Sequence, residues 1–510
     1  MPISGSFVLS SKAFCPEEIV PKPCPLPMVV SLFGGSVLAP SNLPESQVTE
    51  EIKSDVSTVA ATTALNATEE KEEERKTPAL SSTVVPTAVS STSVPTPITD
   101  EKKVTIIGVG RLGLCFALVL ASKGYNVVGV DLSPTYVDHI NNKTLRSSEP
   151  GVEEYLRIVT TMRATTSLVE GAHHSDLLFV LVDTPSTGGE RHYDHSKLSS
   201  VLSNLNTLQV RNKHIVIGCT VMPGYIANVG RFLVKDCENC SLSYNPEFIA
   251  QGDIINGQLR PDMILIGQGS SQAGIRLRQL YRNICDGWVP GQKTSPLIKN
   301  GGPGKTDSGA YLRCMTPESA EICKLALNCF VTMKVAFANL VGDIAEATFN
   351  ARASDITAAM GCDTRIGNKY LQHGYGFGGP CFPRDNRALR GYANSIGVEA
   401  ALFLATDEDN KEHTKTQLQR LMAETDPSQT YVFTGVAYKL NTRVPIIEES
   451  QRLALAVGLA RDGRKVIIRD YADTLHLVRM EYGALFHGYV VLADGVNFPE
   501  PLTSYLPRSS

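Results

Sequence analysis

From Lys103 onward, short apolar runs alternate with amphipathic stretches. The first amphipathic stretch, Leu114–Lys123, ends at Gly124, a residue type that commonly terminates helices. Strands that alternate with helices usually form parallel sheets with helices on both faces. The runs predicted as strands are Val104–Ile107, Asn126–Val130, Leu177–Val182, Ile215–Ile217, Leu242–Tyr244 and Met263–Ile266. The pattern therefore predicts an α/β fold built on a parallel sheet.

A second pattern begins at Thr316-Pro317-Glu318. A hydroxyl, a proline and an acidic residue in this order are typical of a helix start. The following stretch, to about Phe349, contains no further proline, which predicts one long central helix. Beyond it, a strand, a helix and a strand predict a second, smaller α/β unit over Tyr431–Tyr438, Ser450–Ala460 and Lys465–Ile468.

Residues 1–102 differ in composition from the rest of the chain. Residues 55–100 are dominated by Ser, Thr, Val, Ala and Pro around one charge run, Glu69–Lys76. Such a segment buries too little apolar surface to offset the entropy of ordering, so a disordered low-complexity tail is predicted. A solvated tail and a tether for a partner are both open. Residues 26–39 are apolar, but no basic cluster precedes them, so no cleaved signal is predicted.

A length of 510 residues provides for about three domains of ~100–200 residues. We expect an N-terminal domain over 103–315, a central helical domain over 316–425 and a C-terminal domain over 426–510. The formal charge of −4 gives no broad positive field, so nucleic acids and membranes are not expected as partners. Twelve cysteines are too few for a disulfide scaffold and favour a reducing, cytoplasmic location.

A glycine-rich turn separates the first predicted strand from the first helix. It reads G-x-G-x-x-G, and the next predicted strand ends in Asp131. This context is typical of a Rossmann-type dinucleotide-binding domain, in which the glycines admit a pyrophosphate and the acid binds a ribose 2′-hydroxyl. NAD is therefore the expected cofactor, and an ordinary βαβ turn is the alternative. The expected cofactor contacts are Gly108, Val109, Gly110, Arg111, Leu112, Gly113 and Asp131.

The densest signal is the loop 374–380, which is followed directly by Cys381. Four glycines in six residues let a backbone approach a ligand closely. A cysteine after such a loop, with Asp385 four residues later, can be a reactive thiolate, and a buried structural cysteine is the alternative. Cys237 and Cys240 form a C-x-x-C without a second pair at zinc spacing, so no metal site is predicted.

Residues 103–510 resemble the nucleotide-sugar 6-dehydrogenase family, whose members oxidise UDP-glucose, GDP-mannose or UDP-N-acetyl-mannosamine. The resemblance rests on a series of motifs in the same order, and it does not include the tail. The matching stretches are the glycine turn with Asp131, Cys219–Gly224, Asn245–Phe248, Glu321–Asn328, Arg365–Leu371, Gly376–Asp385 and Tyr438-Lys439.

The resemblance implies oxidation of a primary alcohol to a carboxylate with reduction of two NAD⁺. Cys381 would add to the intermediate aldehyde, a second hydride transfer would give a thioester, and water would release the acid. Lys324 and Asn328, four residues apart on one helix face, would stabilise the oxyanions. Asp385 would order a water and hold Lys324, and Glu247 would be the base for hydrolysis.

The resemblance also implies the ligand contacts. Thr220 would position water or the nicotinamide, and Thr184 would join it in the cofactor site. Arg365 would reach the site of a neighbouring subunit, because the family generally forms dimers on the long helix; a homodimer or higher homo-oligomer is expected. The residues implied to bind the nucleotide sugar are Glu247, Phe248, Lys324, Asn328, Arg365, Tyr375, Gly376, Phe377, Gly378 and Lys439.

The chain departs from the family pattern at two places. Gln251 stands where the family usually has a second glutamate, and the segment 443–450 replaces the usual D-D-x-R-E-S after Lys439. Phe382 in C-F-P-R-D favours UDP-glucose, with UDP-glucuronate as the product. Oxidation of GDP-mannose or UDP-N-acetyl-mannosamine, and a catalytically impaired NAD-binding scaffold, are the alternatives. Gly304-Lys305-Thr306 lacks the strand and the upstream glycine of a phosphate-binding loop, so no ATP site is predicted.

Overall fold

The computed structural model describes residues 102–187, 193–248, 252–285, 311–424, 426–439 and 442–493. The predicted tail, Gln251 and the sequence Gly304-Lys305-Thr306 lie outside the described residues. What was expected of them remains a prediction.

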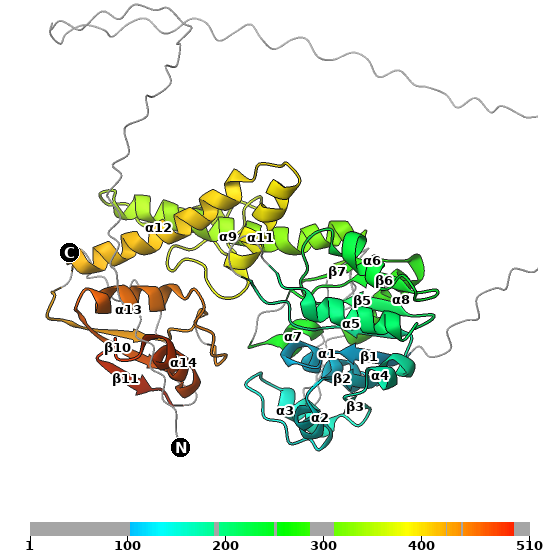
Figure 1. The fold of residues 1–510 in the computed structure, drawn as a ribbon. Helices are drawn as coiled ribbons and strands as arrows, with labels where there is room; N and C mark the ends of the chain where they lie inside the picture. Colours follow the sequence, from blue (N-terminus) through cyan, green and yellow to red (C-terminus); the bar gives the residue numbers. More distant parts are fainter. Residues whose placement is uncertain are drawn as a thin grey trace, which may run out of the picture. The chain divides into compact units, whose positions relative to one another are not determined.

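An eight-stranded sheet is the centre of the N-terminal half (Figure 1). Its strand order is β3-β2-β1-β4-β5-β6-β7-β8. The strands are β1 (Lys103–Ile107), β2 (Asn126–Val130), β3 (Met162–Thr165), β4 (Leu177–Val180), β5 (His214–Ile217), β6 (Ser241–Tyr244), β7 (Met263–Gly267) and β8 (Tyr311–Met315). The α/β fold is confirmed, with one correction to an all-parallel sheet: β7 pairs antiparallel with β6, at Tyr244 and Gly267.

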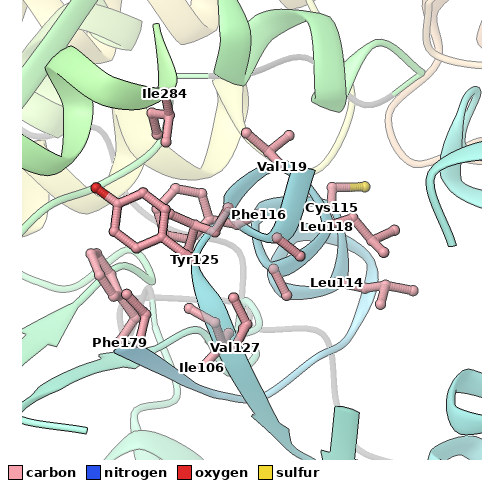
Figure 2. Close-up of a cluster of buried hydrophobic side chains, with 14 of the residues drawn as sticks. Ile106, Leu114, Cys115, Phe116, Leu118, Val119, Tyr125, Val127, Phe179 and Ile284 are labelled. Carbon is pink, nitrogen blue, oxygen red and sulfur yellow. The ribbon is translucent and has the colours of Figure 1, made fainter. Parts of the chain in front are cut away.

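Helices cover both faces of this sheet, as the apolar strands predict. Ile106 and Ile107 are adjacent in β1 but belong to two different buried clusters, because successive side chains of a strand point to opposite faces. Figure 2 shows one of these clusters, in which Phe116 of α1 meets the edge of the Phe179 ring at a centroid distance of 5.0 Å. The helices are α1 (Arg111–Ser122), α2 (Pro134–Asn141), α3 (Val152–Ile158), α4 (Leu168–His174), α5 (Ser196–Thr207), η1 (Ile226–Gly230), α6 (Arg231–Leu233), α7 (Ile254–Leu259) and α8 (Ser271–Ile284).

The long central helix is α9 (Pro317–Glu346), and it ends just before the predicted limit at Phe349. Its start has the predicted cap, since the Thr316 hydroxyl accepts the Ser319 N–H at 3.2 Å. By length and composition α9 could cross a membrane, but its buried face carries polar and charged side chains that pack inside the protein. It packs against three further helices, α10 (Ala353–Gly361), α11 (Phe382–Ser395) and α12 (Ala401–Glu424).

The C-terminal unit contains a three-stranded parallel sheet with the order β11-β10-β9. Its elements are β9 (Thr430–Thr434), α13 (Gln451–Arg461), β10 (Lys465–Asp470), α14 (Ala472–Tyr482) and β11 (Gly488–Val491). The strand predicted over Tyr431–Tyr438 is therefore too long. The backbone turns at Gly435, where φ is +74°, and the next N–H, of Val436, bonds the Asp470 side chain at 2.7 Å instead of a strand.

Candidate active site

The glycine turn is built around two close backbone contacts. A Cβ atom on Gly108 would lie 2.4 Å from the Leu181 carbonyl oxygen, and one on Gly113 would lie 2.0 Å from the Gly108 oxygen. Gly108 also has a φ of +92°, which other residues rarely adopt. A Cβ atom on Gly110 would meet nothing within 4 Å. The first and third glycines are thus required by the fold, whereas the second leaves open space beside the N-terminus of α1, where an anion is favoured.

The other predicted cofactor residues follow the ends of neighbouring parallel strands. Asp131 follows β2 and accepts the Ser133 N–H at 3.2 Å, Thr184 lies beyond β4, and Thr220 lies beyond β5. Because β2, β1, β4 and β5 are adjacent, these side chains gather with the glycine turn at one edge of the sheet, the usual ligand edge of such folds. Within the turn itself, Val109 is fully buried in a hydrophobic cluster, so its side chain serves the core.

The predicted pair on α9 lies in a polar cluster. Lys324 is only 8% exposed; its Nζ donates to the Glu247 backbone carbonyl and lies 4.5 Å from the centroid of the Phe248 ring. Asn328, one turn later, donates through Nδ2 to Asp385 Oδ2 at 2.7 Å. The structure thus brings together five predicted site residues from β6–α7, α9 and α11.

Asp385 is the centre of this cluster and is almost fully buried. Besides Asn328, it accepts the Tyr193 hydroxyl and, at 3.3 Å, the Arg384 Nε–H. The Arg384 guanidinium also lies 4.5 Å from the Tyr193 ring centroid. Sequence reasoning missed both partners. The signal for Arg384 was its place in C-F-P-R-D, but nothing near Tyr193 in sequence pointed to the site.

Burial and charge oppose each other in this cluster. Burial lowers the pKa of the Lys324 ammonium, while the charges of Asp385, Cys381 and Glu247 act to raise it. The influence of Asp385 on Lys324 is thus electrostatic, while the hydrogen bond of Lys324 goes to the Glu247 carbonyl. Burial also raises the pKa of the Glu247 carboxyl to about 7, with Lys324 acting to lower it. A carboxyl with this pKa is suited to proton transfer near neutral pH.

Cys381 is solvent-exposed and is the N-cap residue of the 14-residue helix α11. Desolvation of its sulfur by the surrounding protein raises the pKa of the thiol. The charges of Arg384 and Lys324 act to lower this pKa, and those of Asp385 and Glu448 act to raise it. A helix N-terminus adds a further preference for the thiolate. Cys381 is therefore not a buried structural cysteine, which was the alternative interpretation of the sequence.

The glycine loop before Cys381 contacts the segment that departs from the family pattern. The Gly379 N–H donates to the Glu448 carbonyl at 2.9 Å, and a Cβ on Gly378 would lie 2.1 Å from the Glu449 oxygen. Phe377 is buried, whereas the predicted sugar ligand Lys439 is exposed. The guanidinium of Arg452 lies over the ring of Tyr375, 4.4 Å from the ring centroid.

Arg365 lies apart from the other predicted sugar ligands. It is exposed, and its guanidinium forms an ion pair with Asp363 of the same loop at 2.6 Å. Lys334 of α9 donates to the neighbouring Ile366 and Gly367 carbonyls at 3.0 and 3.2 Å. The loop is thereby tied to the outer face of α9.

One group of side chains in the described residues, Asp343, His373 and His413, brings metal-ligand atoms within 4.8 Å of one another. His413 Nδ1 lies 2.7 Å from Asp343 Oδ2, and its Nε2 lies 2.7 Å from the Gly374 carbonyl. Arg420 lies 3.4 Å from Asp343, and these ion pairs hold the pKa of Asp343 well below its usual range. The contacts are those of a hydrogen-bonded ion-pair network.

Comparison with known proteins identifies the family to which the chain is similar. Residues 102–285 match the NAD binding domain of the UDP-glucose/GDP-mannose dehydrogenase family, and residues 318–412 match its central domain. A GDP-mannose 6-dehydrogenase from Pseudomonas syringae pv. tomato is 28% identical over 371 residues, 69% of this chain and 78% of that protein. A UDP-glucose 6-dehydrogenase from Pseudomonas aeruginosa is 28% identical over 381 residues, 72% of this chain and 78% of that protein.

Among solved structures, a UDP-glucose dehydrogenase from the archaeon Pyrobaculum islandicum has a TM-score of 0.65 at 26% identity. The match covers 78% of this chain and 87% of that chain. The glycine turn and these matches together confirm the Rossmann-type fold and NAD as the cofactor. The residues at the turn fit that group, because space is open at Gly110 and a carboxylate follows β2. The chain belongs to the UDP-glucose/GDP-mannose dehydrogenase family of NAD-dependent oxidoreductases.

Proposed function

We propose that this protein oxidises the 6-hydroxymethyl group of UDP-glucose to the carboxylate of UDP-glucuronate through a thioester on Cys381. The observation that carries the proposal is geometric: Cys381 is the exposed N-cap residue of α11, and Asp385 in the first turn of that helix bonds Asn328, one turn after the buried Lys324. A one-step alcohol dehydrogenase has no use for such a thiol, whereas a four-electron oxidation needs a nucleophile to make the aldehyde tetrahedral.

NAD⁺, when bound, accepts one hydride from the sugar in each of two successive oxidations. Lys324 and Asn328 stabilise the alkoxide and the later tetrahedral oxyanions. The Cys381 thiolate forms a carbon–sulfur bond to the aldehyde, and loss of hydride from that adduct leaves the thioester. Glu247 takes a proton from the water that cleaves the thioester. The balance is one alcohol, two NAD⁺ and one water to one carboxylate, two NADH and three protons.

Fewer observations support UDP-glucose as the substrate than support the type of reaction. Relatives named for UDP-glucose and for GDP-mannose are both 28% identical to the chain. Phe382, next to Cys381, favours UDP-glucose. GDP-mannose is the second candidate, because the cluster around Asp385 acts on the reacting carbon and does not discriminate between bases or hexoses.

We further propose a homodimer formed on the outer face of α9. Phe330, Phe337 and Ile344 repeat at seven-residue spacing and are 59%, 48% and 58% exposed. Residues at this spacing lie on one face of a helix and can pack against the same face of a second copy. In such a dimer Arg365, which is tied to α9, would serve the partner's site. A cytoplasmic location is part of the proposal, because twelve cysteines in 510 residues are too few for a disulfide scaffold.

The proposed reaction is tested by counting NADH per nucleotide sugar consumed. Purified protein is given excess NAD⁺ and a limiting amount of UDP-glucose, GDP-mannose or UDP-N-acetyl-mannosamine. We expect two NADH per UDP-glucose. In Cys381→Ala net oxidation is lost, while NAD⁺ binding measured by calorimetry is unchanged. One NADH per sugar, no NADH with any sugar, or turnover of Cys381→Ala would contradict the proposal, and two NADH only with another sugar would reassign the substrate.

A further inference from the structure

The loop that leads to Cys381 is held by side chains from two helices. Asn339 of α9 accepts the Gly374 N–H at 2.9 Å and donates to the Tyr375 carbonyl at 3.4 Å. His413 and Gln417 of α12 each reach the Gly374 carbonyl at 2.7 Å. These contacts hold the beginning of the loop, six or seven residues before the sulfur.

Asn410 of α12 holds the middle of the loop. Its Oδ1 accepts the Phe377 N–H at 2.8 Å, and its Nδ2 donates to the Phe377 carbonyl at 2.9 Å. Both partners of the amide belong to one residue, so they define its orientation as well as its distance. Asn410 is only 4% exposed, and Phe377 is equally buried. Loss of the amide would leave two buried backbone groups without these bonds.

Gly376 is shaped to this contact. A Cβ atom on Gly376 would lie 2.2 Å from Asn410 Oδ1, closer than any side chain can approach. The glycine just before Phe377 therefore has a specific purpose: it leaves the space that the asparagine amide occupies.

We propose that Asn410 is a positioning residue, which sets the conformation of the loop so that the nucleotide sugar meets the Cys381 thiol. The inference rests on the proposed function, since it assigns to the loop the sugar site of that reaction. The side-chain amide of Asn410 bonds the Phe377 backbone and not Cys381. It acts through the Phe377 backbone, four residues before Cys381, and a displacement of about 1 Å at a reacting centre can lower the rate ~100-fold.

The test compares Asn410→Ala and Asn410→Asp with the full-length protein. The aspartate keeps an acceptor for the Phe377 N–H but places a carboxylate oxygen against the Phe377 carbonyl. We expect both variants to lower kcat/KM for the nucleotide sugar at least tenfold, mainly through kcat, with unchanged NAD⁺ affinity. Thr406→Val is the matched control, because its buried hydroxyl donates to the Leu402 carbonyl within α12. It should leave both parameters near the wild-type values.

Two measurements keep the inference independent of the identity of the sugar. Hydrogen–deuterium exchange at the Phe377 amide should accelerate in both Asn410 variants and not in Thr406→Val. Gly376→Ala should accelerate the same exchange in the wild-type background and add little to Asn410→Ala, because the clash is then gone. Unchanged Phe377 protection, or fully additive effects, would overturn the inference. A wild-type protein that oxidises no nucleotide sugar would refute the proposed function and leave the exchange result to decide the role of Asn410.

Discussion

Lys324 and Glu247 are in contact through one hydrogen bond, and each shifts the pKa of the other. The ammonium donates to the backbone carbonyl of Glu247, while each charged side chain opposes the effect of burial on the pKa of its neighbour. Burial is the larger cause for both residues. The result is a carboxyl whose pKa lies near 7 beside a desolvated ammonium. The first group is suited to proton transfer and the second to stabilisation of an oxyanion.

The raised pKa of Glu247 predicts how thioester hydrolysis depends on pH. Only the carboxylate can act as a base, so the rate constant for hydrolysis should rise with pH through about 7 and then level off. One unit below the pKa the carboxylate fraction, and with it the rate constant, is roughly tenfold lower. The measurement is single-turnover decay of the acyl-enzyme by rapid quench at pH 5.5 to 8.5.

The matched variant for this prediction is Glu247→Gln, which keeps the size of the side chain and removes the base. An acyl-enzyme should then accumulate and be visible by intact mass, and the step near pH 7 should disappear. If the step persists in the variant, another group is the base.

At the scale of an element, different glycines of the turn before α1 serve the packing of the fold and the binding of the cofactor. At Gly108 and Gly113 a Cβ atom would collide with backbone atoms, so no other residue fits there. Gly110 faces open space and has an ordinary φ of −61°. Packing thus explains the first and third glycines of the motif, and binding of the cofactor explains the second, Gly110.

Alanine at Gly113 should therefore affect stability, whereas alanine at Gly110 should affect NAD⁺ binding. Gly113→Ala should destabilise the protein by ~1–3 kcal/mol, a typical effect of overpacking, in urea unfolding followed by circular dichroism. Gly110→Ala should unfold like the wild type and weaken NAD⁺ binding roughly tenfold or more, equivalent to about 1.4 kcal/mol, in calorimetric titration. A stable Gly113→Ala protein, or tight NAD⁺ binding by Gly110→Ala, would contradict this division.

At the scale of the whole molecule, α9 serves the site with one face and leaves the other exposed. Its inner face carries Lys324 and Asn328 of the proposed site, and Asn339, which bonds the glycine loop. Glu321 on the same helix accepts the Gly224 and Ile226 N–H groups at 2.6 and 2.9 Å, so α9 also anchors the turn after Thr220. The outer face carries the apolar residues of the proposed dimer.

Phe337→Glu should therefore disrupt the dimer. A charge placed at the centre of an apolar contact is costly to bury, so we expect the mass measured by light scattering to fall to that of one chain. Phe232→Glu is the control, because that phenylalanine is 66% exposed on α6 and does not belong to the apolar row on α9. Activity should fall with the dimer and should likewise fall in Arg365→Ala, which leaves the mass unchanged. A Phe337→Glu variant that stays dimeric would place the interface elsewhere.

Much of the fold and the core of the site could be predicted from sequence, because the relevant signals are local. Strand and helix periods, the cap at Thr316 and the glycine turn depend on residues within a few positions of one another. Lys324 and Asn328 share a face because a helix repeats every 3.6 residues. The motif that contains Cys381 likewise carries its own neighbour, Asp385.

The tertiary structure alone decided which distant side chains complete the site. Tyr193 reaches Asp385 across 192 positions, and Asn410 reaches Phe377 across 33. It also decided the reversed direction of β7 and the pKa of Glu247, which depends on the burial of that carboxyl. Local sequence determines secondary structure through backbone sterics and periodicity. Partners and desolvation arise only when separate elements pack, since they are properties of the surroundings of a residue.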